Sequence, residues 1–321
     1  MEEGIKLFLS HNSADKVIVK KIANVLTSQG FSVWFDDREI KAGDSLSEKI
    51  NEGLNNHDVF IIFLSENSIT SSWVQKELKI VLEKRNSRKS RNKIIPLKLD
   101  NCKVPSYLEK YYYIDLSNEK FNASINKLLD SILTKQVLKD KYSHSFPGKA
   151  ILDNVEVSVD ISGINYKNSK FIEKVTIVPI RKLYKYWKEL NVDGELQSIN
   201  CSSGELYTSK SANGIYKLET RWSKPLEIGK KYSFKYEYAI IDEFLNEKNW
   251  YYRIESPTRK VTFIFSFDIK NYPDKFKVIN KRELAILEEL QISPIIEKNK
   301  VTFIFSNDFP DYRDYYEFTW E

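Results

Sequence analysis

The run VFIIFL at residues 59–64 is apolar throughout and has polar residues on both sides. An uninterrupted apolar run of this length is typical of a strand buried on both faces, as in a parallel sheet covered by helices. Apolar runs predict four further strands, at residues 5–9, 31–35, 94–97 and 112–116. Helical spacing of apolar residues predicts helices at residues 17–26, 45–54, 72–82 and 121–133. Strands and helices alternate, which predicts an α/β domain with a parallel five-stranded sheet between two layers of helices.

The pattern changes towards the C-terminus. Residues 136–149 contain Lys, Asp, Ser, Pro and Gly without periodicity, and we expect a linker there. Beyond it, apolar and polar residues alternate and aromatic residues are frequent, which predicts strands at residues 155–161, 172–178, 215–221, 231–241, 250–255, 260–267, 300–306 and 315–320. Two helices are expected among them, at residues 181–190 and 281–290. We therefore expect an α/β domain at residues 1–135 and, at residues 150–321, a mainly antiparallel β-sandwich-like domain with a few helices.

One heptapeptide occurs twice in the second domain. The sequence KVTFIFS at residues 260–266 recurs unchanged at residues 300–306. We favour a local duplication, and convergence on a good strand sequence is the alternative. Because such a segment would promote aggregation on an open edge, we expect it inside a sheet or paired with another protomer.

The composition limits the partners and ligands. There are 50 basic and 45 acidic residues, and this mild excess does not predict nucleic-acid binding. Cys102 and Cys201 lie far apart and there are only three histidines, so we expect no metal site. The first residues are acidic, and no run approaches the roughly 18 uncharged apolar residues of a membrane helix. We expect a soluble protein of the cytoplasm that does not contact a membrane.

Polar residues follow the strands of the first domain. In an open parallel sheet, ligands bind beyond the carboxyl ends of the strands. The polar residues that follow the first three strands are Ser10, His11, Asn12, Asp36, Asp37 and Ser65. No glycine-rich phosphate-binding fingerprint is present, so a nucleotide would have to be held in another way.

These segments, in this order, resemble a TIR domain, the Toll/interleukin-1 receptor module, over about residues 1–135. The resemblance is carried by LFLSHN at 7–12, GFSVWFD at 30–36, AGDSL at 42–46, FIIFLS at 60–65, IPL at 95–97 and VP at 104–105. It implies a flavodoxin-like fold for this domain. We recognise no family in residues 150–321.

The enzymes among TIR domains cleave the nicotinamide–ribose bond of NAD+ and leave ADP-ribose or a cyclised isomer. Their catalytic glutamate follows a Trp by four residues, and Trp73 and Glu77 match this pattern. Positions four apart lie on one helix face, and a carboxylate beside the ribose can stabilise an oxocarbenium-like transition state. The resemblance thus implies that Glu77 is catalytic and that NAD+ is a substrate, with no cofactor. The alternative for Glu77 is a solvent-facing glutamate paired with a lysine.

The same resemblance suggests substrate-binding residues. Ser10 is expected among them. His11 and Asn12 stand where enzymes of the family place polar or basic residues near the ligand phosphates, although many members have an aromatic residue followed by Arg there. Trp34 lies beside the adenine or in the core. Asp36 either hydrogen-bonds to ribose hydroxyls or caps the loop, and Ser65 either contacts the nucleotide or caps its strand. Trp73 would help to shape the pocket.

The loop at residues 37–44 has a second role in this family, because it contacts a neighbouring TIR domain. Asp37, Lys41 and Gly43 are the residues that we expect in this assembly loop. The resemblance implies an NAD+ glycohydrolase activated by self-association, acting as an antiviral effector whose C-terminal domain senses a trigger or drives assembly. A non-enzymatic TIR scaffold is the alternative, and a host-directed bacterial TIR protein is a third.

Overall fold

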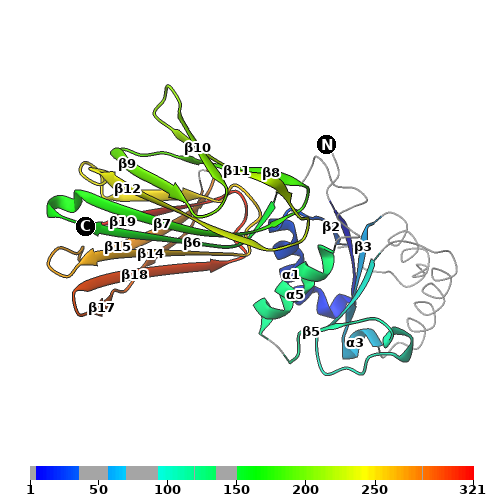
Figure 1. The fold of residues 1–321 in the computed structure, drawn as a ribbon. Helices are drawn as coiled ribbons and strands as arrows, with labels where there is room; N and C mark the ends of the chain where they lie inside the picture. The colour runs from blue at the N-terminus through cyan, green and yellow to red at the C-terminus, as the bar shows by residue number, and fades with distance from the viewer. Residues whose placement is uncertain (1–4, 36–56, 70–92, 119, 135–149, 284) are drawn as a thin grey trace. The chain divides into compact units, whose positions relative to one another are not determined.

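The computed structural model describes residues 5–35, 57–69, 93–118, 120–134, 150–283 and 285–321 (Figure 1). The chain divides into two compact units, Met1–Phe146 and Pro147–Glu321. The division falls within the segment that the sequence predicts as a linker. The boundaries of the two domains stay a prediction.

The first unit is built on five parallel strands in the order β2-β1-β3-β4-β5. These strands are β1 (Lys6–Ser10), β2 (Ser32–Phe35), β3 (Val59–Leu64), β4 (Lys93–Lys98) and β5 (Ile114–Asp115). The described helices are η1 (Ser13–Asp15), α1 (Lys16–Ser28), α3 (Glu66–Ile69), η2 (Ser106–Leu108) and α5 (Phe121–Ile132). The predicted parallel α/β fold is confirmed. The helices expected at residues 45–54 and 72–82 lie outside the described residues.

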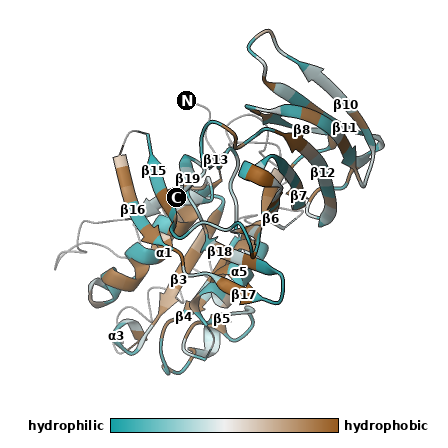
Figure 2. Cartoon of the chain, turned by 90° about the vertical axis from the view of Figure 1, so that its left-hand side faces the viewer, coloured by the Kyte–Doolittle hydropathy of each residue, from teal (hydrophilic) through white to brown (hydrophobic). Residues whose placement is uncertain are grey.

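The burial of β3 explains why its apolar sequence predicts this fold. All six of its residues are buried, because β1 and β4 pair with its two edges and apolar side chains cover both of its faces. Figure 2 shows how apolar this part of the sheet is. Helix α1 buries Val19, Ile22 and Leu26, which are spaced by three and four residues on one helix face.

The second unit contains fourteen described strands in three sheets. The seven-stranded sheet has the order β17-β18-β14-β6-β7-β12-β9. Its strands are β6 (Ala150–Ser162), β7 (Asn168–Pro179), β9 (Glu195–Cys201), β12 (Tyr232–Ile241), β14 (Lys260–Asp268), β17 (Ile295–Glu297) and β18 (Lys300–Asp308). The four-stranded sheet has the order β13-β19-β15-β16 and contains β13 (Asn249–Arg253), β15 (Phe276–Arg282), β16 (Ala285–Gln291) and β19 (Asp314–Trp320). The third sheet has the order β10-β11-β8 and contains β8 (Leu183–Leu190), β10 (Glu205–Lys210) and β11 (Tyr216–Leu226).

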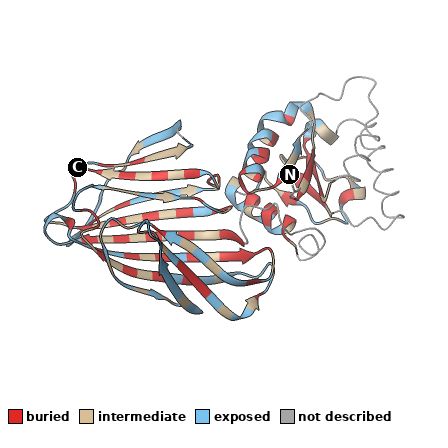
Figure 3. Ribbon diagram, turned by 90° about the horizontal axis from the view of Figure 1, so that it is seen from above, coloured by how far each residue is buried: buried red, intermediate tan, exposed pale blue. Residues whose placement is uncertain are grey.

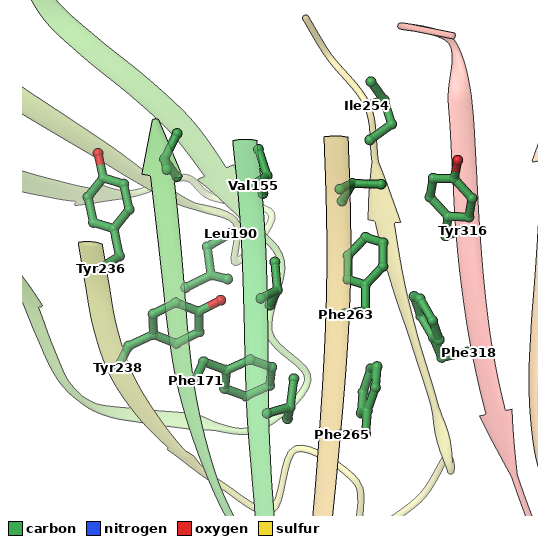
Figure 4. Close-up of a cluster of buried hydrophobic side chains, with 14 of the residues drawn as sticks. Val155, Phe171, Leu190, Tyr236, Tyr238, Ile254, Phe263, Phe265, Tyr316 and Phe318 are labelled. Carbon is green, nitrogen blue, oxygen red and sulfur yellow. The ribbon is translucent and has the colours of Figure 1, made fainter. Parts of the chain in front are cut away.

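Aromatic side chains join the two larger sheets. Phe263 and Phe265 of β14 place their rings 4.8 and 4.9 Å from that of Phe318 on β19 (Figure 4). Phe171 of β7 stacks on Tyr238 of β12 at 4.9 Å. Buried residues alternate with half-buried or exposed ones along these strands, as Figure 3 shows. Among the described strands of this unit only β6 and β14 pair in parallel, so the expected mainly antiparallel architecture is confirmed.

The two helices expected in this unit are wrong. Residues 183–190 form β8, which pairs with β11 from Tyr216↔Leu190 to Arg221↔Lys185. The helical spacing of apolar residues in this segment was misleading, because strand pairing overrides a short local pattern. Residues 281–282 belong to β15 and residues 285–290 to β16, and the two strands form an antiparallel pair. Glu283, which follows β15, has a left-handed φ of 56° that an α-helix does not allow. The only helix described in this unit is the 3₁₀ turn η3 (Ile164–Tyr166).

The two copies of KVTFIFS are neighbours in the seven-stranded sheet. They lie in β14 and β18, which pair with each other with Ile264 opposite Ile304. β14 is an interior strand between β6 and β18, so the expectation of a position inside a sheet holds for the first copy. The duplication itself stays a prediction.

A buried carboxyl in the second unit makes stability depend on pH. Glu243 is 7% exposed, and its carboxylate accepts hydrogen bonds from the backbone N–H groups of Asp193 and Gly194, both at 3.1 Å. Burial raises the pKa of Glu243 from 4.5 to about 7. The folded state therefore binds this proton more tightly than the unfolded chain does. The stability that results is fully present below pH 4.5 and is lost as the pH rises through 7.

We expect Glu243→Gln to remove this loss, since an amide oxygen can still accept both hydrogen bonds. As the pH rises from below 4.5 to above 7, the wild-type chain should lose about 3 kcal/mol more unfolding free energy than the variant. Urea denaturation at a series of pH values measures the difference. The exposed Glu247→Gln is the control and should follow the wild type. Parallel curves for wild type and Glu243→Gln would contradict the prediction.

Candidate functional site

The carboxyl ends of β1 and β3 bring two candidate loops together. Ser10, the last residue of β1, is in register with Ile62 of β3, and the two strands are parallel neighbours. The residues that follow each strand therefore lie at one edge of the sheet. Ser10 and His11 are half-buried there, and Ser65 begins the loop after β3.

Asp15 connects these two loops. Its Oδ2 accepts a hydrogen bond of 2.5 Å from the hydroxyl of Ser65, and its Oδ1 accepts one of 3.2 Å from the Asn67 amide. Asp15 is 8% exposed and Ser65 is fully buried. The hydroxyl of Ser65 also accepts a hydrogen bond from the backbone N–H of Ser68. The Ser65 hydroxyl is thus engaged within the loop, and both interpretations of Ser65, a contact with the nucleotide or a cap of its strand, stay predictions.

Asn12 ties the first loop to the same network. Its Oδ1 accepts a hydrogen bond from the backbone N–H of Ala14 and so caps η1, while its Nδ2 donates to the carbonyl oxygen of Asn67. Both ends of the amide are therefore engaged in positioning the loops. This arrangement leaves the edge of the sheet shaped by side chains from two segments more than fifty residues apart.

Trp34 of β2 forms an aromatic platform on one face of the sheet. Its ring stacks on Phe8 at 4.6 Å, and Phe8 stacks on Phe60 at 4.9 Å, so a row of rings crosses β2, β1 and β3. His57 lies 5.7 Å from Trp34. Trp34 is 39% exposed although it packs on the buried Phe8. Part of the Trp34 ring thus packs on the core and part is open to solvent, and its position beside the adenine stays a prediction.

Six of the candidate residues lie outside the described part of the chain: Asp36, Asp37, Lys41, Gly43, Trp73 and Glu77. Asp15 is the residue that sequence reasoning missed. The signal that could have found it is its place in the same strand-to-helix loop as Ser10, His11 and Asn12.

The described residues offer little for metal or thiol chemistry. No group of three His, Cys, Asp or Glu side chains among them could hold a metal ion. Burial raises the pKa of the Cys102 thiol to about 11, so this thiol is protonated at neutral pH and is a poor nucleophile. Within the same described ranges, no helix is long and apolar enough to cross a bilayer.

Comparison with known proteins agrees with this geometry. The family model for the TIR domain matches residues 7–129. This part of the chain is a TIR domain. The match covers the five parallel strands, the Asp15 network and the Trp34 platform.

Two curated relatives resemble this TIR domain in sequence. The 2' cyclic ADP-D-ribose synthase BtTIR of Bacteroides thetaiotaomicron is 43% identical over 72 residues, which is 22% of this chain and 25% of that protein. The NAD(+) hydrolase PdTIR of Paracoccus denitrificans is 35% identical over 104 residues, which is 32% of this chain and 34% of that protein. The chain thus spans about a quarter to a third of the length of these relatives.

A solved structure resembles the same part of the chain more distantly. The TIR domain of the Toll-related receptor TRR-2 from Hydra magnipapillata has 19% sequence identity and a TM-score of 0.31. The alignment covers 38% of this chain and 93% of that domain.

We expect Asp15→Ala to destabilise the TIR domain by about 1–3 kcal/mol, because the buried Ser65 hydroxyl loses its acceptor. The exposed Glu109→Ala should change stability by less than about 0.5 kcal/mol. Urea unfolding measures the loss of unfolding free energy. Hydrogen exchange of the backbone amides of β1 and β3 shows whether this loss falls in the TIR domain. An Asp15→Ala variant as stable as the wild type would mean that the network contributes nothing to folding.

Proposed function

We propose that this chain cleaves the nicotinamide–ribose bond of NAD+, with Glu77 as the catalytic carboxylate. The observation that carries the proposal is the likeness of its TIR domain to one relative named as an NAD(+) hydrolase and another named as a 2' cyclic ADP-D-ribose synthase. The partly exposed ring of Trp34 supports it, since it offers a flat surface on which a ring of NAD+ can stack.

The proposed reaction breaks the bond between the ribose C1′ atom and the nicotinamide nitrogen. Nicotinamide leaves as a neutral base with the electron pair, and the ribose becomes an oxocarbenium ion. The Glu77 carboxylate stabilises this positive charge. Attack by water gives ADP-ribose and a proton, whereas attack by a ribose hydroxyl of the same molecule gives a cyclic isomer and a proton.

We assign the remaining candidate residues to the same substrate. Trp34 stacks on one flat ring of NAD+, and Ser10, His11 and Asn12 face the diphosphate. Asp36 is assigned to the ribose hydroxyls, and Trp73 is assigned to closing the pocket because its four-residue spacing from Glu77 predicts a shared helix face. Ser65 acts through Asp15, because its hydroxyl is already engaged in the loop network.

The proposal includes activation by self-association of TIR domains through Asp37, Lys41 and Gly43. The residues after the linker would then sense a trigger or promote assembly, in a cytoplasmic antiviral effector that depletes NAD+. Under this scheme, turnover per chain rises with protein concentration.

The test is release of nicotinamide from NAD+ by the full chain over a range of protein concentrations. Nicotinamide release supports the enzyme, and chromatography of the ribosyl product separates hydrolysis from cyclisation. A chain that assembles without consuming NAD+ would favour the non-enzymatic TIR scaffold instead.

A further inference from the structure

Strand β18 has a partly uncovered edge. One of its edges pairs with β14 along all nine residues, from Lys300↔Asp268 to Asp308↔Lys260. Its other edge pairs only with the three-residue β17, which stands opposite Lys300–Thr302. In the described part of the chain, no strand pairs with the outer edge of residues 303–308.

The backbone of this segment points its unused groups outward. At the two ends of the β14–β18 pair, the carbonyl oxygen of Asn299 accepts from Ile269 N–H, and the N–H of Phe309 donates to the carbonyl oxygen of Arg259. Residues 299 and 309 therefore bond towards β14. Because backbone direction alternates along a strand, the N–H and C=O groups of Ile304 and Ser306 point away from β14. They form a row that can pair with another strand.

The usual protection of an edge strand is missing here. Residues 301–307 read VTFIFSN, with no proline and no charged residue, and the pairing with β14 is regular, without a bulge; the charged residue of the uncovered stretch is Asp308 at its end. The opposite edge of the same sheet differs, because β9 begins with Glu195 and has an irregular register with β12. Ile304 is 42% exposed at the centre of the uncovered edge.

The sequence of β18 pairs with its own repeat inside this chain. β14 contains the same heptapeptide and lies antiparallel to it, with Ile264 opposite Ile304. The hydroxyls of Thr262 and Ser306 are hydrogen-bonded at 2.9 Å, and Phe263 stacks over Phe305. One face of this pair is apolar and the other carries hydroxyls, so the strand is complementary to an antiparallel copy of itself.

We propose that two copies of this chain associate through β18, strand against strand and antiparallel. Pairing in the register used inside the chain would place the partner over Thr302, which β17 covers. The uncovered residues that point outward are centred on Ser306, so the twofold axis passes there, and Ser306 stands opposite the same residue of the second copy. The pairing joins two seven-stranded sheets into one and covers Ile304, with β17 in place.

Disulfide formation tests the geometry in the full chain. Cys201 is first replaced by Ser, since Cys102 is buried and inaccessible. In this background Ser306→Cys should form a disulfide-linked dimer under mild oxidation. Ser198→Cys is the matched control, an exposed serine on β9 at the opposite edge of the same sheet, and it should stay monomeric on a non-reducing gel. No dimer with Ser306→Cys, or equal dimer with both variants, would overturn the proposal.

Sedimentation equilibrium tests the affinity. With the twofold axis at Ser306, residue 304 stands opposite Asp308 of the second copy, and like charges in opposite positions repel each other. Ile304→Glu is therefore expected to raise the dissociation constant by about tenfold or more. Ile286→Glu makes the same change at a 60% exposed position on β16, in another sheet, and should leave the dissociation constant unchanged. A dissociation constant that Ile304→Glu leaves unchanged would place the contact elsewhere and would refute pairing through β18. Neither readout depends on NAD+ cleavage, so failure here is separate from failure of the proposed enzyme.

Discussion

Glu77→Gln is expected to lower the rate of nicotinamide release by about a hundredfold to a thousandfold. The change keeps the shape of the side chain and removes its negative charge. If the carboxylate stabilises the oxocarbenium ion, the loss falls on the transition state and lowers kcat, while KM for NAD+ changes little. Initial rates of nicotinamide release over a range of NAD+ concentrations give both constants.

A second glutamate of the TIR domain provides the control for Glu77. Glu109 is exposed and is not among the candidate site residues, and Glu109→Gln makes the same change in charge. It should retain wild-type turnover. Circular dichroism checks that both variants are folded. A folded Glu77→Gln chain with wild-type turnover would refute the assigned role. Equal losses of turnover in both variants would show that the effect does not depend on the position of the glutamate.

The parallel sheet could be predicted because the apolar run of residues 59–64 is compatible with only one position in the fold. The apolar run of β3 can be buried on both faces only in the middle of a covered sheet. Residues 183–190 carried a weaker signal. Leu183, Tyr186, Trp187 and Leu190 have helical spacing, yet Tyr and Trp favour strands, and pairing with β11 decides the outcome. Such pairing joins distant segments, so a local pattern does not contain it.

The candidate site, like the fold, could be predicted from the sequence only in part. Ser10, Asn12 and Ser65 could be placed at one edge because parallel strands end on the same side. The role of Asp15 could not be predicted, because its partner Ser65 is fifty residues away and the hydrogen bond exists only in the folded domain. For a similar reason, the sequence could not decide whether Trp34 lies beside the adenine or in the core. Its exposure depends on how neighbouring strands present Phe8 and Phe60.

The core of the second unit contains a buried ion pair whose disruption should have a large effect on stability. Glu173 of β7 is 1% exposed, and its carboxylate accepts hydrogen bonds from Lys188 of β8 and, at 3.1 Å, from the hydroxyl of Tyr252. Lys188→Met keeps most of the side-chain volume and leaves the buried carboxylate without its cation. We expect a loss of about 3–5 kcal/mol of unfolding free energy, measured by urea denaturation with hydrogen exchange of β7 and β8.

The double variant Glu173→Gln/Lys188→Met separates the charge from the packing. It removes both charges, and the amide oxygen introduced at position 173 can still accept from Tyr252, so most of the lost stability should return. Lys174→Met is the matched control on the same strand, since Lys174 pairs with Glu156 at the surface, and it should cost less than about 1 kcal/mol. If the double variant were less stable than Lys188→Met, the cost would arise from packing around Lys188. The loss of stability in Lys188→Met would then not be caused by the unpaired charge of Glu173.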